Sequence, residues 1–145
     1  MSATAAADRA RGRVGAVGPA DPPELGPVPE VGPDGVPVAA DAFLTHLAVE
    51  KGRSELTLRA YRQDLRRYAG FLARRGLDVD DVTEVDVQAF VTELRSGELA
   101  AASVIRIAGT VRAWHRFRAA EGDSPSDPTS TVEVPRRPSA LPRAL

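Results

Sequence analysis

The sequence contains no cysteine, and it also lacks any long apolar run. Without cysteine, disulfide bonds, thiolate metal sites and cysteine nucleophiles are excluded, which leaves His46 and His115 as the imidazole ligands. No stretch approaches the roughly 20 apolar residues that would span a membrane, and the N-terminus lacks the hydrophobic core of a signal peptide. We therefore expect a soluble, cytoplasmic protein with no metal site, no cofactor, no membrane partner and no small-molecule substrate.

An excess of charge of one sign is absent as well, because 19 lysines and arginines face 20 acidic residues, for a net charge of −1. The charges are nevertheless segregated along the chain. Residues 55–75 carry six arginines and two acidic residues, and residues 102–121 carry four arginines and one acidic residue. Between them, residues 78–95 carry six acidic residues and one arginine. Because the distribution of charge matters more for a partner than its sum, a nucleic-acid partner remains compatible with this sequence.

Glycine and proline are concentrated towards the two ends. Residues 1–37 consist mostly of Ala, Gly, Pro and Val without a helical or alternating period, which predicts a disordered tail. Residues 123–145 include five prolines, which predict an extended linker. The remaining residues, 38–122, are enough for one modest core, since a domain of that size hides roughly 60 to 65% of its unfolded surface. A deep enzyme cleft is not expected.

Between the two ends the apolar residues recur with the period of amphipathic helices. The predicted helices are 38–51, 55–75 after the N-cap Ser54, a third from Thr83 to Ser96-Gly97, and 102–121. The fold class predicted is therefore all-α, a small four-helix bundle. The residues expected to face its core are Ala40, Phe43, Leu44, Leu47 and Ala48, then Leu58, Tyr61, Leu65, Tyr68 and Leu72, then Val87, Phe90, Val91 and Leu94, and finally Val104, Ile107, Ala108, Val111 and Trp114.

The outward faces of the two basic helices carry arginine together with short hydroxyl and amide groups. Arginine neutralises phosphates and can read guanine, hydroxyl groups position a phosphate backbone, and a helix fits the major groove of DNA. An ordinary soluble helix also needs one solvated face, and arginine can fill it. The residues by themselves leave both interpretations open.

Several short motifs follow one another in order along the chain. They are Phe43-Leu44-x-x-Leu47, Ser54-x-x-Thr57-Leu58-x-x-Tyr61-x-x-Asp64-Leu65-x-x-Tyr68-x-x-Phe71-Leu72, Val82-Thr83-x-x-Asp86-Val87-x-x-Phe90, Ser103-x-x-Arg106, Val111-Arg112-x-Trp114-His115-x-Phe117, Asp127-Pro128, Pro135-Arg136-Arg137-Pro138 and Leu141-Pro142-x-x-Leu145. In this order they resemble the N-terminal core-binding domain, a SAM-like domain, of tyrosine recombinases of the Xer and phage-integrase type. The resemblance covers about residues 40 to 145.

This resemblance implies a domain that forms half of a clamp around duplex DNA, with its second and fourth helices in the major groove. The implied partners are double-stranded DNA and other recombinase protomers. Carried onto this sequence, the DNA-contacting residues are Thr57, Arg59, Arg62, Gln63 and Arg66 on one helix, and Ser103, Arg106 and Thr110 on the other. The chain departs from the family at Arg118, where a large apolar residue is usual.

The family's chemistry uses a tyrosine that attacks a backbone phosphate, assisted by arginines, a lysine and histidines of a C-terminal domain. The present sequence ends where that domain should start, so we expect no catalytic residue here. Tyr61 and Tyr68 both lie on the apolar stripe of the second helix, which predicts core packing. The prediction is duplex DNA binding, without catalysis, by part of a tyrosine recombinase that is truncated, split or decayed.

Two alternatives remain at this point. A helical protein-interaction module would show an exposed apolar patch on the first or fourth helix and no joint basic face. The DNA-binding half of a split recombinase would work with a separate catalytic polypeptide.

Overall fold

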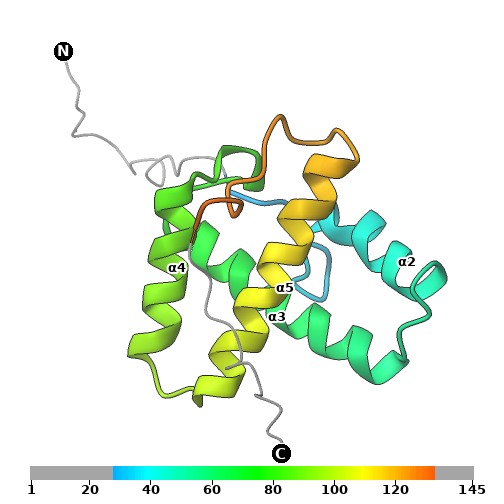
Figure 1. The fold of residues 1–145 in the computed structure, drawn as a ribbon, viewed down its shortest axis with the longest axis horizontal. Helices are drawn as coiled ribbons and strands as arrows, with labels where there is room; N and C mark the ends of the chain where they lie inside the picture. The colour runs from blue at the N-terminus through cyan, green and yellow to red at the C-terminus, as the bar shows by residue number, and fades with distance from the viewer. Residues whose placement is uncertain (1–27, 133–145) are drawn as a thin grey trace, which may run out of the picture.

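The computed structural model describes residues 28–132 of the chain (Figure 1). The elements are the 3-10 helix η1 (Val38–Ala40), α2 (Asp41–Val49), α3 (Glu55–Arg74), the 3-10 helix η2 (Val79–Asp81), α4 (Glu84–Ser96) and α5 (Ala101–Ala120). Within this part of the chain there is no strand, and the one isolated bridge joins Val31 to Pro37. The all-α prediction is confirmed. No helix of the described residues is long and apolar enough to cross a bilayer.

The helix ends follow from local chemistry. The Ser54 side chain accepts a hydrogen bond of 3.1 Å from the backbone N–H of Thr57, which caps α3 as predicted. At the start of α4, Asp86 accepts hydrogen bonds from the backbone N–H and the hydroxyl of Thr83. Gly76 has a φ of 67°, in the left-handed region that lets the chain turn away after α3.

The first predicted helix differs from the structure at both ends. Its first residues form the 3-10 turn η1, and α2 ends at Val49 instead of Lys51. The prediction that Ala48 faces the core is wrong, because it is exposed. Helical rotation of about 100° per residue places Ala48 at the edge of the stripe formed by Phe43 and Leu47, which are buried.

The core lies where α3 and α5 cross, with α4 on one side and α2 on the other (Figure 1). Trp114 and Tyr68 are the largest fully buried side chains. Phe90 of α4 packs against Tyr68, with 4.8 Å between the two ring centroids. The predicted inward residues of α4 and α5 are all buried, and Tyr61 of α3 is half-buried. The inward stripes of the two long helices, read from their period, are thus confirmed.

The packed unit extends beyond the predicted helical domain on both sides. Val36, in the predicted tail, is buried in the core, and its backbone N–H donates a hydrogen bond of 3.1 Å to the Asp34 carboxylate. In the predicted linker, Thr129 and Val132 are buried, and Asp127 accepts hydrogen bonds from the N–H and hydroxyl of Thr129. The rest of the predicted tail and linker, 1–27 and 133–145, lies outside the described residues.

Candidate nucleic-acid interface

The first two thirds of α3 carry a row of exposed arginines. Because residues three and four apart share a helix face, these arginines project together from the side opposite the apolar stripe. They are Arg59, Arg62, Arg66 and Arg67, and Gln63 is exposed among them. None of the four forms an ion pair with a carboxylate of residues 28–132. Their positive charge is therefore not neutralised within this part of the protein.

The C-terminal end of α3 is different, because the acidic helix α4 packs beside it. Arg74 pairs with Glu93 at 2.5 Å, and Arg75 pairs with Asp86 at 3.2 Å. Burial acts to raise the pKa of Asp86, but the hydrogen bonds from Thr83 and Arg75 outweigh it and hold that pKa below its usual range. The acidic segment seen in the sequence thus neutralises one end of α3 and leaves the other end basic.

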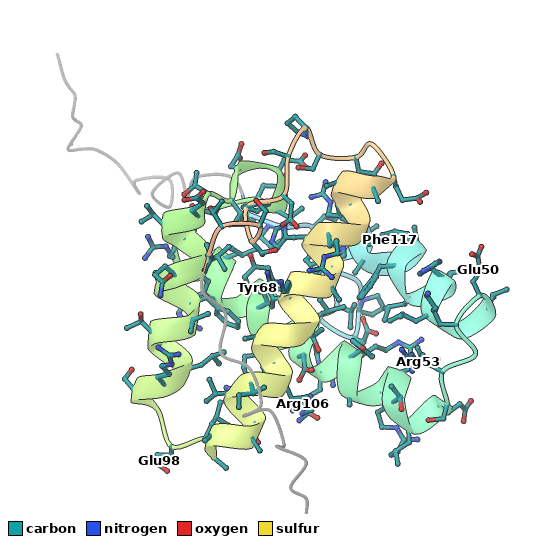
Figure 2. The ribbon with its side chains drawn as sticks, in the orientation of Figure 1. Glu50, Arg53, Tyr68, Glu98, Arg106 and Phe117 are labelled. Atoms are coloured by element: carbon teal, nitrogen blue, oxygen red, sulfur yellow. The ribbon has the colours of Figure 1, made fainter. Side chains whose placement is uncertain are left out.

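A groove of about 500 Å³ runs between the first half of α3 and the middle of α5. Its walls include Leu56, Thr57 and Ala60 from α3, and Ile105, Arg106 and Gly109 from α5. Figure 2 shows Arg106 on the lower half of α5, beside α3. The groove therefore joins the two helices from which DNA contacts are predicted.

Asp64 lies beneath this groove and organises it. The Nη1 group of Arg106 donates to both Asp64 carboxylate oxygens, at 2.6 and 2.5 Å. Thr110 donates its hydroxyl to the same carboxylate at 2.7 Å. The Asp64 side chain is only 2% exposed, whereas that of Arg106 is 47% exposed. A buried carboxylate thus holds one end of an arginine whose other end reaches solvent.

The prediction that Thr110 faces outward is wrong. Thr110 is buried, because its hydroxyl is drawn inward to the Asp64 carboxylate. Its β-carbon lies at the boundary between the inward and outward faces of α5, where a polar partner below decides the direction. Thr110 is therefore part of the support of Arg106 and has no free surface of its own.

The structure brings only some of the predicted contact residues together. Thr57 and Arg106 share the groove, and Ser103 lies half-buried one turn before Arg106. Arg62 instead lines a second depression, beside Gly32 and Asp34 of the N-terminal segment. The predicted residues therefore do not gather in a single pocket: some line the groove between α3 and α5, and Arg62 lies at another depression.

The far end of α5 is buried and serves the core. His115 lies 2.7 Å from the Tyr68 hydroxyl, and burial lowers the pKa of His115 to about 4. Burial also raises the pKa of Tyr68. Arg118, buried as well, reaches Asp80 at 2.5 Å and lies over the Trp114 ring. His115 is thus packed in the core, and an ion pair accommodates Arg118 at a position where the resemblance to tyrosine recombinases implies a large apolar residue.

Two features of the groove were not predicted from the sequence. Asp64 belongs to the motif of the second helix, and a single acid on the inward edge of a basic helix is the signal that indicates a buried partner for a cation. Gly109 lies exposed in the middle of α5, and a Cβ added there would meet nothing within 4 Å. Among residues 28–132, no group of three or more histidine or acidic side chains is placed to hold a metal ion.

The described residues thus define an all-helical domain in which α3 and α5 flank a groove that holds Arg106, and in which α3 also carries exposed arginines without an ion-pair partner among these residues. Residues 40–122 match the model of the phage integrase N-terminal SAM-like domain. This match covers more than half of the chain, so the chain belongs to that family.

Similar proteins are tyrosine recombinases. The chain is 40% identical over 111 residues to tyrosine recombinase XerD of Mycobacterium tuberculosis strain H37Rv, which covers 71% of this chain and 36% of that protein. It is 39% identical over 114 residues to XerD of Corynebacterium glutamicum (74% and 38%) and 40% identical over 106 residues to XerC of Roseiflexus castenholzii (72% and 34%). The chain spans about a third of the length of these relatives. No solved structure matches it significantly.

Proposed function

We propose that this chain binds duplex DNA through the joint face of α3 and α5, as the core-binding domain of a tyrosine recombinase. The observation that carries the proposal is the uneven pairing of the α3 arginines. The four arginines from Arg59 to Arg67 have no carboxylate partner among the described residues, whereas Arg74 and Arg75 are paired with α4. Lysines and arginines that neutralise phosphates release counterions, which is the main source of affinity for DNA.

The proposed contact residues on α3 are Thr57, Arg59, Arg62, Gln63 and Arg66. On α5 they are Ser103 and Arg106, and Thr110 acts through Asp64. The α3 arginines supply positive charge, and the hydroxyl and amide groups supply hydrogen bonds that set the position of the backbone. Other recombinase protomers bound to the same DNA would be further partners.

The tyrosines support a binding role without strand cleavage by the domain itself. A nucleophilic tyrosine must reach a phosphate and lose its proton. Tyr68 is fully buried with a raised pKa, and its hydroxyl lies against His115. Tyr61 is half-buried and packs edge-on against Phe43 at 6.0 Å between ring centroids. Neither is placed as a nucleophile.

The protein-interaction alternative gains no support from the surface. The large apolar side chains that are most exposed lie singly on different helices, with Val49 on α2, Leu56 on α3 and Val85 on α4. A docking patch of the predicted kind would gather several of them on α2 or α5. A split recombinase would share the DNA interface proposed here and would differ by regaining strand exchange when a separate catalytic polypeptide is added.

The proposal is tested by titrating the full chain into a labelled mixed-sequence duplex at several salt concentrations. We expect the affinity to fall steeply with salt, and Arg59→Ala and Arg62→Ala each to reduce the slope of log K against log salt by about 1. Arg74→Ala is the matched control, since it removes an arginine of the same helix that Glu93 already neutralises. Absence of binding at low salt, or an equal effect of Arg74→Ala, would contradict the proposal.

A further inference from the structure

Arg106 differs from the other arginines of the DNA-binding face in how it is held. We infer that Asp64 and Thr110 fix Arg106 as a directional donor that reads a base edge, while the α3 arginines supply the charge that binds phosphates. This inference rests on the proposed function and assigns different tasks to residues of the same face.

The hydrogen bonds leave one side of Arg106 occupied and the other available. Its Nη1 group donates to both oxygens of Asp64. Within residues 28–132, its Nη2 and Nε groups have no hydrogen-bond partner. A guanidinium is planar, so fixing Nη1 also fixes the plane of the remaining donors. The remaining donors of this groove-lining side chain therefore have a set direction before any ligand arrives.

The positive charge of Arg106 is also neutralised within the protein, because the side chain is paired with the Asp64 carboxylate. A neutral pair contributes little to counterion release, which depends on the net charge brought to the phosphates. A fixed pair of donors is instead suited to the N7 and O6 acceptors of guanine in the major groove. Arg106 therefore contributes oriented hydrogen-bond donors to the proposed interface, and not net positive charge.

The groove around Arg106 is lined mostly by apolar or small residues, and Thr57, Tyr61 and Thr110 line it as well. Leu56, Ala60 and Ile105 line it, and these side chains suit base edges and thymine methyl groups better than phosphates. Gly109 adds open space one turn further along α5. Glycine inside a helix is unfavourable by about 0.5 to 1 kcal/mol relative to alanine, and its usual benefit is the close approach of another molecule. The groove is thus shaped to admit a base edge.

The experiment selects bound sequences from a pool of duplexes with a randomised centre, using the full chain. We expect the wild-type protein to enrich a preferred base pair at one position. Arg106→Lys should reduce that preference about tenfold or more, because lysine lacks the planar pair of donors, while changing the salt slope little. Asp64→Asn and Thr110→Val should weaken the same preference by loosening the support of Arg106.

Arg59→Ala is the contrasting variant, expected to lower affinity for all sequences and to keep the preferred base pair. Thermal unfolding of each variant identifies any that fail to fold, and Arg106→Lys keeps a cation beside Asp64 for this reason. Binding without sequence preference, or a preference unchanged in Arg106→Lys, would overturn the inference alone. Absence of wild-type binding to any duplex would overturn the proposed function with it.

Discussion

Arg106 and Arg118 lie on the same helix and each pairs with an aspartate, but their exposures are reversed. In the Arg106 pair the aspartate is buried and the arginine reaches solvent. In the Arg118 pair the arginine side chain is 7% exposed and Asp80 is 62% exposed. Figure 2 shows Arg106 beside the lower part of α5, well separated from Phe117 near the other end of the helix. One helix thus presents a cation outward near its start and withdraws a cation inward near its end.

This difference shows why counting arginines along a basic helix does not locate a binding face. Both residues add the same charge to the sequence, yet only the first can meet a ligand. Whether a paired arginine can contact a ligand depends on which member of the ion pair is buried. A buried charge requires its counterion, whereas an exposed charge is hydrated by water. The comparison leads to three predictions, taken from the largest expected effect to the smallest.

The buried end of α5 should make the domain sensitive to acid. The pKa of His115 is lowered by burial from 6.5 to about 4, so the unfolded state binds more protons between these values. The contribution of neutral His115 to the free energy of unfolding should therefore be fully present above pH 6.5. The free energy of unfolding should fall by about 3 kcal/mol as the pH drops towards 4. Denaturant unfolding at a series of pH values measures it.

The matched variant for the acid response is His115→Phe, which keeps a ring but cannot titrate. It should remove most of the pH dependence in this window, whatever its effect on stability at neutral pH. A wild-type stability that is flat between pH 6.5 and 4, or a dependence retained by His115→Phe, would show that the buried imidazole is not the cause.

Replacing each arginine by leucine should have unequal effects on stability at the two sites. Arg106→Leu leaves the Asp64 carboxylate buried without a cation and should lower the free energy of unfolding by about 2 to 3 kcal/mol. Arg118→Leu places an apolar side chain against Trp114 and leaves Asp80 hydrated, so a change of about 1 kcal/mol or less is expected. Thermal denaturation of both variants at neutral pH measures the two losses of stability. Equal losses would contradict the difference proposed between the two ion pairs.

A substitution at Gly109, in the groove, should change the stability of the domain and its affinity for DNA in opposite directions. Gly109→Ala should raise the free energy of unfolding by about 0.5 to 1 kcal/mol, since alanine favours the helix and no atom lies within 4 Å of the added Cβ. The same change should weaken DNA binding by narrowing the groove. Gly70→Ala in α3 is the control, because the added Cβ would meet only the end of Arg74, at 3.7 Å. Weaker binding in both variants would assign the effect to helix stiffness.

The sequence was sufficient for the parts of the fold that depend on periodicity and local capping. The stripe that ends in Tyr68 and Leu72, the cap at Ser54 and the glycine after α3 each follow from residues close together in the chain. The exposed row from Arg59 to Arg66 follows from the same period. These predictions needed no knowledge of how the helices pack.

The parts that could not be predicted depend on contacts between distant residues. Asp64 and Thr110 are 46 residues apart, and their hydrogen bond turns a predicted outward side chain inward. Arg118 meets Asp80 across 38 residues, which makes a charged residue acceptable in the core. The period of a helix gives a direction to within part of a turn, and residues at its boundary are settled by a tertiary partner.

The most direct test of the central claim is a map of the DNA-binding surface by backbone amide chemical shifts as a duplex is added to the labelled full chain. The account predicts that the largest changes fall in the first half of α3 and from Ser103 to Gly109 in α5, with α4 little affected. Changes centred on α4, or no changes at low salt, would contradict it.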